Sequence, residues 1–357
     1  MIRFRSLARL AALSAVLAMV AAACGSSGST ASGTTSSTAG GSGGSSTTAA
    51  GGATTTAASG KVFRIAVVAP SAKNDVAFTQ SIFDALDRIA KTRKIQVDSS
   101  DNLFVVEDAA NAIRGYADKG YDLVIAHGSQ YGAPLQEIAP KYPKVAFAWG
   151  TAADTFGLAN VSSYSVASDE GGYVMGTIAA QLTKSNKIGI VGPIEVGDAK
   201  LYVDGFKAGA KTQNPSVDAT ANYIQSFSDV NLAQEAATAF VKNGADVLTG
   251  TAQMVVGATG VAKAGKIPWF GTQSNQTQLG PDIVVASQVY HWEVALNALI
   301  DSIQAGTLGG KTYTANLQNG GLVIEYNAGY TLDPAIKAKA DQTAASIKGG
   351  SLKTGVS

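Results

Sequence analysis

The chain has 357 residues, which is long for a single hydrophobic core and favours two lobes. Its formal net charge is +1 and it carries no basic stripe interleaved with aromatic residues, so nucleic acid is not an expected partner. Only 15% of the residues are charged while glycine occurs 40 times, a composition typical of secreted or surface proteins with many tight turns.

The first residues are typical of a secretory signal. Arg3 and Arg5 precede an apolar run at residues 7–20, which is too short to span a bilayer comfortably, and small residues follow it. Cys24, the only cysteine, comes directly after these alanines, so the chain cannot form an internal disulfide. We expect a signal peptide over residues 1–23 and lipidation of Cys24, because this arrangement resembles a bacterial lipobox. Ordinary signal cleavage beside an incidental cysteine is the alternative.

Residues 25–60 are almost entirely glycine, serine, threonine and alanine. Because such a composition buries no apolar surface, residues 24–60 are predicted to form a flexible tether with a root-mean-square span of ~30–35 Å. Residues 40–44 match the pattern G-x-S-x-G, but no predicted strand precedes them and no helix follows, so no nucleophile is assigned. A lipid anchor followed by a tether predicts a folded part that stays near a membrane.

The folded part is predicted to begin with the segment VFRIAVVAPSAKNDVAFTQ at residues 62–80. Residues 62–69 have the composition of a strand buried on both faces of a parallel sheet. A polar loop carrying Asn74 and Asp75 follows, and apolar residues return at helical spacing from Phe78. This order presents ligand-binding groups at the carboxyl edge of an open α/β sheet. A helix cap is the alternative role for Asp75.

Strands and helices alternate through the rest of the folded part, in two series of similar length, each about 100 residues. The expected strands are at residues 94–97, 123–126, 145–149, 161–166 (an edge strand or crossover), 187–191, 221–227, 246–249, 268–272 and 283–289. The expected helices are at residues 78–91, 106–119, 133–141, 170–182, 200–212, 232–243, 256–264 and 292–304. The fold class is therefore α/β, with two similar Rossmann-like lobes rather than one continuous sheet.

The lobes are predicted to be discontinuous in sequence. We expect an N-terminal lobe of residues 61–166 and 290–318, a C-terminal lobe of residues 167–289 and 319–335, and a C-terminal helix or tail at residues 336–357. The chain would cross between lobes near Ala167 and Tyr290, which makes a hinge from separate strands. This geometry predicts a ligand cleft between the carboxyl edges of two sheets, with closure on ligand binding.

The sequence contains no Walker loop, H-E-x-x-H, C-x-x-C or strand-borne G-x-S-x-G motif, so no cofactor or metal is predicted. Aromatic and neutral hydrogen-bonding residues instead gather after the predicted strands. They suit a flat, polar, uncharged ring that stacks on aromatic faces and is hydrogen-bonded at its edges. The candidate ligand-binding residues are Asn74, Asp75, Phe78, Thr79, His127, Ser129, Trp149, Tyr202, Thr251, Gln253, Gln273 and Tyr290. Core packing is the alternative for each aromatic residue, including Tyr202.

Six segments, in their order and spacing, resemble the basic membrane protein (BMP) family of substrate-binding lipoproteins, whose best-known members bind purine nucleosides for ABC-type importers. They are NDVAF at residues 74–78, YDLVIA at 121–126, PKVAF at 143–147, EGGYVMG at 170–176, VDGFKAG at 203–209 and NGADV at 243–247. The resemblance implies a type I periplasmic-binding-protein fold with a hinge and a central ligand cleft. It also implies a monomer that hands its ligand to a membrane permease.

Two departures from the family pattern bear on the ligand. Nucleoside binders carry G-x-D-x-D-Q where this chain has GTQSNQ at residues 271–276, so Gln273 replaces a carboxylate that family members use on the ribose hydroxyls. They also carry a lysine shortly after a strand-end serine, where this chain has Ser287 followed by Gln288, Val289 and Tyr290. A site without these groups should discriminate against a sugar. We expect a nucleobase-like or other small heterocyclic or amide ligand, held by Asp75 and Phe78, more than a full nucleoside.

The function predicted first is a membrane-anchored, extracytoplasmic solute-binding protein of an ABC importer. A lipoprotein that senses the same ligand and signals to a membrane receptor needs the same cleft and is an alternative. A hydrolase acting on the ligand is a third possibility, for which Asp75 and His127 are the only pair available as acid and base.

Overall fold

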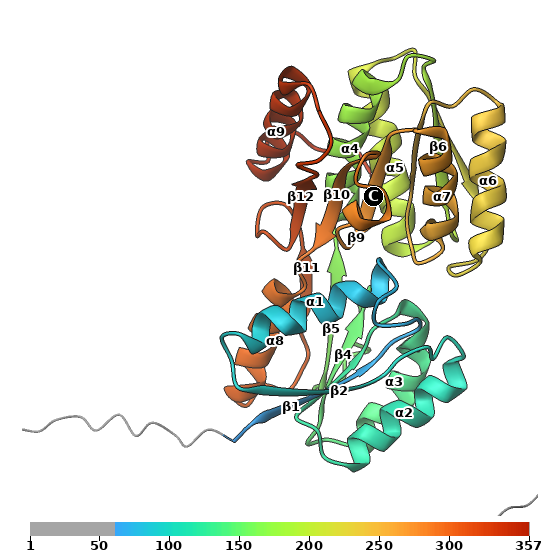
Figure 1. Ribbon diagram of the computed structural model, residues 1–357. Helices are drawn as coiled ribbons and strands as arrows, with labels where there is room; N and C mark the ends of the chain where they lie inside the picture. Colours follow the sequence, from blue (N-terminus) through green and yellow to red (C-terminus); the bar gives the residue numbers. More distant parts are fainter. Residues whose placement is uncertain (1–60, 357) are drawn as a thin grey trace, which may run out of the picture. The chain divides into compact units, whose positions relative to one another are not determined.

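The computed structural model describes residues 61–356, which form two α/β lobes (Figure 1). The expected signal peptide at 1–23, the lipidation site Cys24 and the tether at 24–60 lie outside the described residues. In the part of the chain that the structure describes, no helix combines the length and the apolar character needed to cross a membrane.

The sheet of the N-terminal lobe has the strand order β11-β5-β4-β3-β1-β2, and every neighbouring pair is parallel. Its strands are β1 (Phe63–Val68), β2 (Ile95–Ser100), β3 (Leu123–Ala126), β4 (Ala146–Gly150), β5 (Val161–Val166) and β11 (Thr312–Ala315). The helices of this lobe are α1 (Phe78–Ala90), α2 (Val106–Asp118), α3 (Gly132–Ile138) and α8 (Glu293–Gln304). Alternate residues of β1 enter two different cores, with Ile65 packed in the α1 core and Ala66 in the α2 core. The first strand is therefore buried on both faces, as its composition predicts.

The sheet of the C-terminal lobe has the order β12-β10-β9-β8-β6-β7, in which only the β10–β12 pair is antiparallel. Its strands are β6 (Lys187–Gly192), β7 (Asp218–Tyr223), β8 (Val247–Gly250), β9 (Trp269–Gln273), β10 (Val284–Tyr290) and β12 (Leu322–Tyr326). Its helices are α4 (Ser168–Leu182), α5 (Gly197–Gln213), α6 (Val230–Lys242), α7 (Val255–Gly265) and α9 (Pro334–Lys348). The predicted α/β class with two Rossmann-like lobes is confirmed.

The structure corrects the expectations for several strands. β7 begins at Asp218, three residues before the expected strand at 221–227, because it is a polar edge strand without an apolar run to mark it. β5 is not an edge strand, since β11 pairs outside it. Neither β11 nor β12 was expected as a strand. Both are short segments that pair with strands far away in the sequence, so no local pattern identifies them.

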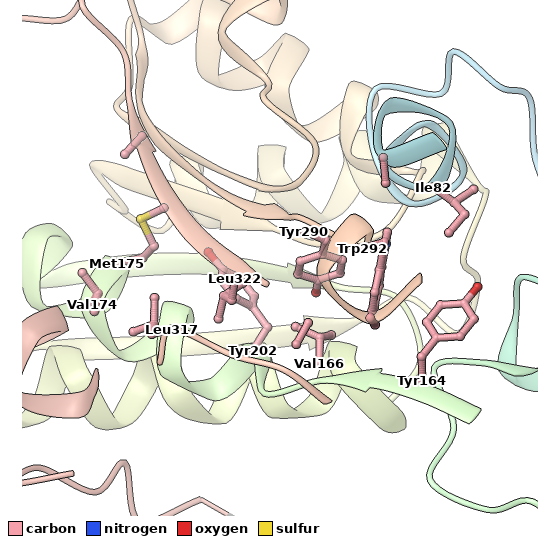
Figure 2. Packing of buried hydrophobic residues seen from close by; sticks show 14 of the residues in the cluster. Ile82, Tyr164, Val166, Val174, Met175, Tyr202, Tyr290, Trp292, Leu317 and Leu322 are labelled. Carbon is pink, nitrogen blue, oxygen red and sulfur yellow. The ribbon is translucent and has the colours of Figure 1, made fainter. Parts of the chain in front are cut away.

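Three segments connect the sheets: the β5–α4 junction, the β10–α8 junction and the loop between β11 and β12. Aromatic residues pack where these segments pass. The rings of Tyr164 and Tyr290 each meet the indole of Trp292 edge to face at 5.1 Å between centroids. Figure 2 shows Tyr290 and Trp292 side by side, with Val166 and Leu322 from the other two crossing segments nearby. The hinge is therefore filled by the same apolar core that continues into both lobes.

Helices α4 and α5 lie against each other with glycine at the contact. A Cβ added to Gly176 would lie 2.0 Å from the Phe206 carbonyl oxygen, and one added to Gly209 would lie 2.0 Å from that of Tyr173. These glycines belong to two of the segments that carry the family resemblance, at residues 170–176 and 203–209. Those segments therefore encode close helix packing rather than a ligand contact.

Candidate functional site

A cavity between the lobes opens where strands of both sheets end. It encloses about 500 Å³ of space not filled by atoms, part of it open to solvent. Three phenylalanines give it apolar walls: Phe78, Phe104 and Phe227. Its polar side chains are Ser129, Gln130, Thr151, Asp198, Gln253 and Gln273.

Four residues that line this cavity have a left-handed backbone. Their φ angles are +55° at Thr151, +54° at Gly197, +74° at Ala252 and +72° at Gln273. Thr151, Ala252 and Gln273 lie at or just after the carboxyl end of a parallel strand, and Gly197 begins α5, the helix that follows β6. Thr151, Ala252 and Gln273 carry a Cβ, which disfavours this region, and such strain concentrates at functional sites. The strained backbone therefore points to the same edge of the sheets as the cavity does.

Phe78 forms a wall of the cavity and is supported from behind by His127. The two rings are parallel, with centroids 4.0 Å apart, and the imidazole is fully buried. His127 Nε2 lies 3.1 Å from the Phe78 carbonyl oxygen, and Nδ1 lies 2.7 Å from the Tyr164 hydroxyl. Because the carbonyl can only accept, we place the proton on Nε2, so Nδ1 accepts from Tyr164. Burial lowers the pKa of His127 to about 4, which keeps the ring neutral at pH 7.

Asp198 is in the first turn of α5 and lines the cavity from the C-terminal lobe. The Ser168 hydroxyl donates to its main-chain carbonyl at 2.5 Å, and the buried Tyr290 hydroxyl donates to Oδ2 at 3.1 Å. Burial raises the pKa of Asp198, while hydrogen bonds from the Tyr290 and Gln273 side chains oppose that rise. The carboxylate is thus held in one orientation by groups that do not themselves close the cavity.

Two buried side-chain oxygens near this edge have no hydrogen-bond partner in the described chain: Gln273 Oε1 and Thr251 Oγ1. Gln273 lines the cavity, whereas Thr251 is fully buried next to the cavity residue Ala252. Buried polar atoms normally find a partner, so an unpartnered acceptor beside a cavity is a place for a ligand donor.

The structure brings four of the twelve sequence-predicted residues to the cavity wall: Phe78, Ser129, Gln253 and Gln273. Thr251 and Tyr290 lie directly behind it, through their neighbours Ala252 and Asp198. The remaining six lie elsewhere.

Asp75 is engaged as a helix cap. Its carboxylate accepts from the main-chain N–H groups of Ala77, Thr79 and Gln80 at 2.9–3.0 Å, and from the Ser71 hydroxyl at 2.7 Å. It is not a wall residue, so the expectation that it holds a ligand ring is replaced by the capping alternative. The cap places Phe78, the first residue of α1.

The other residues outside the cavity have structural contacts. Asn74 lies in an open surface hollow beside α1, and the Thr79 hydroxyl pairs with Ser71 at 2.6 Å. Trp149 stacks on Phe156 and donates to the carbonyls of the 128–129 loop at 3.2 Å, so it positions the loop that carries Ser129. Tyr202 is buried and its hydroxyl meets Thr249 Oγ1 at 2.7 Å, as the core-packing alternative requires.

The acid–base pair considered for a hydrolase does not form. Asp75 is engaged as the cap of α1, and His127 is buried behind Phe78. Nor does any group of three or more potential metal-ligating side chains gather within residues 61–356.

Sequence reasoning missed Asp198, Phe104, Phe227, Gln130 and Thr151. All five follow the carboxyl end of a strand, namely β6, β2, β7, β3 and β4 respectively. Asp198 had a usable signal, because it is the first acidic residue of the helix after the glycine-containing loop at 192–197. Phe104 and Phe227 had none, since their loops are long and the bounds of β7 were misplaced.

Comparison with known proteins gives a consistent family. The model of the Bmp family, described as ABC transporter substrate-binding protein PnrA-like, matches residues 62–353. The chain is 26% identical to the transcriptional activator protein Med of Bacillus subtilis, over 83% of this chain and 90% of that protein. It is 26% identical to a purine-binding protein of Brucella abortus, over 72% and 73% of the two chains. It is 27% identical to an ABC transporter nucleoside-binding protein of Lactococcus lactis, over 79% and 88%.

Solved structures agree on the fold. The solute-binding protein of an ABC transporter system from Conexibacter woesei superposes with a TM-score of 0.69 at 25% identity, covering 82% of this chain and 98% of that one. A periplasmic solute-binding protein from Actinobacillus succinogenes with bound D-allose gives a TM-score of 0.56 at 15% identity, covering 74% and 97%. The two lobes therefore have the type I periplasmic-binding-protein fold.

Proposed function

Since this chain belongs to the Bmp family of ABC transporter substrate-binding proteins, we propose that its interlobe cavity binds a small heterocycle such as a purine nucleobase or nucleoside-like ligand. Members of this family are binding proteins and not enzymes. The observation that carries the proposal is the cavity wall, in which Phe78, Phe104 and Phe227 surround hydrogen-bonding side chains. Phenyl rings provide stacking faces for a flat ring, and amides and hydroxyls fix its edges. Two relatives, the purine-binding protein of Brucella abortus and the nucleoside-binding protein of Lactococcus lactis, support the same ligand class.

A free base is favoured over a nucleoside by the two departures from the family pattern. Gln273 lines the cavity where the resemblance implies a carboxylate for the ribose hydroxyls. Tyr290, which stands where nucleoside binders carry a lysine, is fully buried and directs its hydroxyl to Asp198. Without these two charged groups, a ribose would recover fewer hydrogen bonds for the water that it loses on binding.

A thermal-shift screen of the full-length protein with nucleobases, nucleosides, small amides and sugars tests the ligand class. A ligand at about 100 times its dissociation constant stabilises the fold by about 2.7 kcal/mol, which gives a readable rise in Tm. We expect purine bases to raise the Tm more than the matching nucleosides at equal concentration. A rise with sugars alone would overturn the ligand class and leave the family assignment standing.

The partner that we propose for delivery is the permease of an ABC importer. In residues 61–356, every large hydrophobic side chain that is strongly exposed follows the carboxyl end of a strand, on the same edges that form the cavity: Phe104, Val105, Val106, Val196, Val230, Leu232 and Val256. Exposed apolar residues gathered in this way mark an interaction surface. Val105→Ser combined with Val230→Ser should leave ligand affinity unchanged and reduce uptake of labelled ligand by cells. Unchanged uptake would remove this surface from the proposal.

Anchoring at the extracytoplasmic side of the membrane, through lipid on Cys24, rests on the sequence. Metabolic labelling with a fatty acid should mark the wild-type protein and not Cys24→Ser, and the variant should be released from the membrane fraction. Equal labelling of both proteins would reject the lipid site.

A sensing role is the second candidate. The Bacillus subtilis relative, of which the match covers 90%, is named a transcriptional activator. The two roles separate in a deletion strain. Import requires that uptake of the labelled ligand falls when the gene is removed, whereas sensing requires that gene expression stops responding to the ligand while uptake is retained.

A further inference from the structure

The described wall of the cavity carries negative charge and no positive charge. Asp198 is the only charged side chain on its wall among the residues that the structure describes, and no lysine, arginine or histidine lines it. Phe78, Phe104 and Phe227 present aromatic rings, whose faces carry partial negative charge. A ligand in this cavity therefore meets acceptors and π faces, and a negatively charged ligand finds no cation to offset Asp198.

The Asp198 carboxylate is oriented by neighbouring protein groups. The Tyr290 hydroxyl donates to Oδ2 at 3.1 Å, and the Gln273 side chain and the main-chain N–H groups of Asp198 and Ala199 also favour the ionised carboxylate. The tyrosine is fully buried against Trp292, and the Ser168 hydroxyl pins the main chain of Asp198 at 2.5 Å. These contacts fix the carboxylate at the cavity wall, and the hydrogen bond from Tyr290 is made to Oδ2 rather than to Oδ1.

A second acceptor lies beside it. Gln273 lines the same cavity and its Oε1 is buried without a partner, while its side chain also favours the ionised form of Asp198. A carboxylate at position 273 would instead repel Asp198, so the two positions are compatible as a carboxylate and an amide.

From this arrangement, and resting on the proposed function, we infer that Asp198 is a specificity-determining residue that selects purines presenting adjacent N–H donors at one edge. Guanine has such an edge, with N1–H next to an exocyclic amino group, and two parallel N–H···O bonds to one carboxylate are strong and directional. Adenine places an acceptor at N1, which would face the carboxylate. Xanthine, which readily loses a proton, would bring a negative charge to a wall that already carries one.

Isothermal titration of the full-length protein with the guanine–adenine pair and the guanosine–adenosine pair tests this inference. We expect guanine to bind the wild-type protein about 10- to 100-fold more tightly than adenine, the range of hydrogen bonds to a charged group. Asp198→Asn should reverse the order or abolish the difference, because an amide offers both a donor and an acceptor to adenine. Asp282→Asn, a change to an exposed carboxylate away from the cavity, is the matched control and should keep the wild-type ratio.

A second variant tests the inference independently, should Asp198→Asn fail to fold. Tyr290→Phe keeps the buried ring and removes only the hydroxyl that fixes Oδ2, so it should lower the guanine-to-adenine ratio about 3- to 10-fold. If purines bind but the wild-type protein prefers adenine, or if neither variant changes the ratio, the inference is overturned while the proposed function stands. If no purine base or nucleoside binds, both fail.

Discussion

The imidazole of His127 lies parallel to the ring of Phe78 and hydrogen-bonds to the carbonyl of that same residue, with 4.0 Å between the ring centroids and 3.1 Å between Nε2 and the oxygen. One buried side chain therefore fixes both the ring and the main chain of a cavity wall residue. Phe78 is in turn the first residue of α1, whose start is set by the cap from Asp75. The binding surface is thus positioned by residues that do not touch the cavity.

Truncating a side chain of the cavity wall should lower the ligand affinity more than it lowers the folding stability. Phe78→Ala deletes the stacking face, and base–aromatic stacking contributes about 1–3 kcal/mol, so we expect ligand affinity to fall about 5- to 150-fold. Calorimetric titration measures this loss. Phe156→Ala, which removes a ring stacked on Trp149 outside the cavity wall, is the control and should change affinity less than threefold, about 0.6 kcal/mol. Equal losses in the two variants would mean that Phe78 is not a ligand contact.

The buried His127 predicts a pH dependence of folding stability. Its pKa is about 4 in the folded protein and near 6.5 in the unfolded chain, so between these values the unfolded state binds more protons. Stability from this group is complete above about pH 6.5 and is lost as the pH falls towards 4, by about 3 kcal/mol in total. Urea unfolding of the wild-type protein and of His127→Gln across this range measures it. The variant should show a flatter pH profile, and an unchanged slope would assign the effect to other groups.

Asp75 should behave as a cap. Its loss in Asp75→Ala leaves the main-chain N–H groups of Ala77, Thr79 and Gln80, at the start of α1, without their acceptor, so we expect the free energy of unfolding to fall by about 2 kcal/mol. Asp229→Ala is a graded comparison, because Asp229 accepts from only one such group in α6, that of Leu232, and should cost about 1 kcal/mol. If Asp75→Ala weakened ligand binding more than Phe78→Ala and left stability intact, Asp75 would be a ligand contact after all.

Replacing a helical glycine with alanine should have opposite effects at the contact between α4 and α5 and at an open position of α7. Gly176→Ala would place a Cβ 2.0 Å from the Phe206 carbonyl oxygen and should destabilise the protein by about 3 kcal/mol, because two helix backbones must separate. Gly260→Ala is in the interior of α7 with no atom within 4 Å of the added methyl group, and should stabilise it by about 0.5–1 kcal/mol. Thermal or denaturant unfolding of both variants checks the sign. A neutral Gly176→Ala would show that the helices can move apart freely.

The lobes are also linked by hydrogen bonds at the edge of the cavity. Ser274 Oγ donates to the Ala77 carbonyl at 2.9 Å, and Gln276 Nε2 lies 3.3 Å from that of Val76. Ser274→Ala should therefore favour separation of the lobes, with ligand affinity about 3- to 10-fold lower and the change mainly in the dissociation rate. Stopped-flow measurement of ligand release tests this, with Ser228→Ala as an exposed control outside the interface. Equal release rates in the wild-type protein and Ser274→Ala would contradict a role for this contact in closure.

The sequence by itself determined the architecture of this protein. Apolar β-branched runs alternating with amphipathic helices are local signals, since burial on both faces of a parallel strand dictates its own composition, as in β1. The same logic placed candidate residues after strand ends and found Phe78, Ser129, Gln253 and Gln273. The glycine-rich segments of α4 and α5 were visible too, although their meaning as a helix contact was not.

Only the tertiary structure decided which polar residues are free to meet a ligand. Asp75 and Asp198 look alike in sequence, each beside the start of a helix after a strand. The Asp75 carboxylate is engaged by main-chain N–H groups of its own helix start, whereas Asp198 lines the cavity and is oriented by a tyrosine 92 positions away. The strands β11 and β12 were not predicted for a related reason, since each is specified by a partner strand in a distant part of the chain. Local composition fixes where strands and helices form, whereas the partner of a side chain depends on contacts made only after the lobes have assembled.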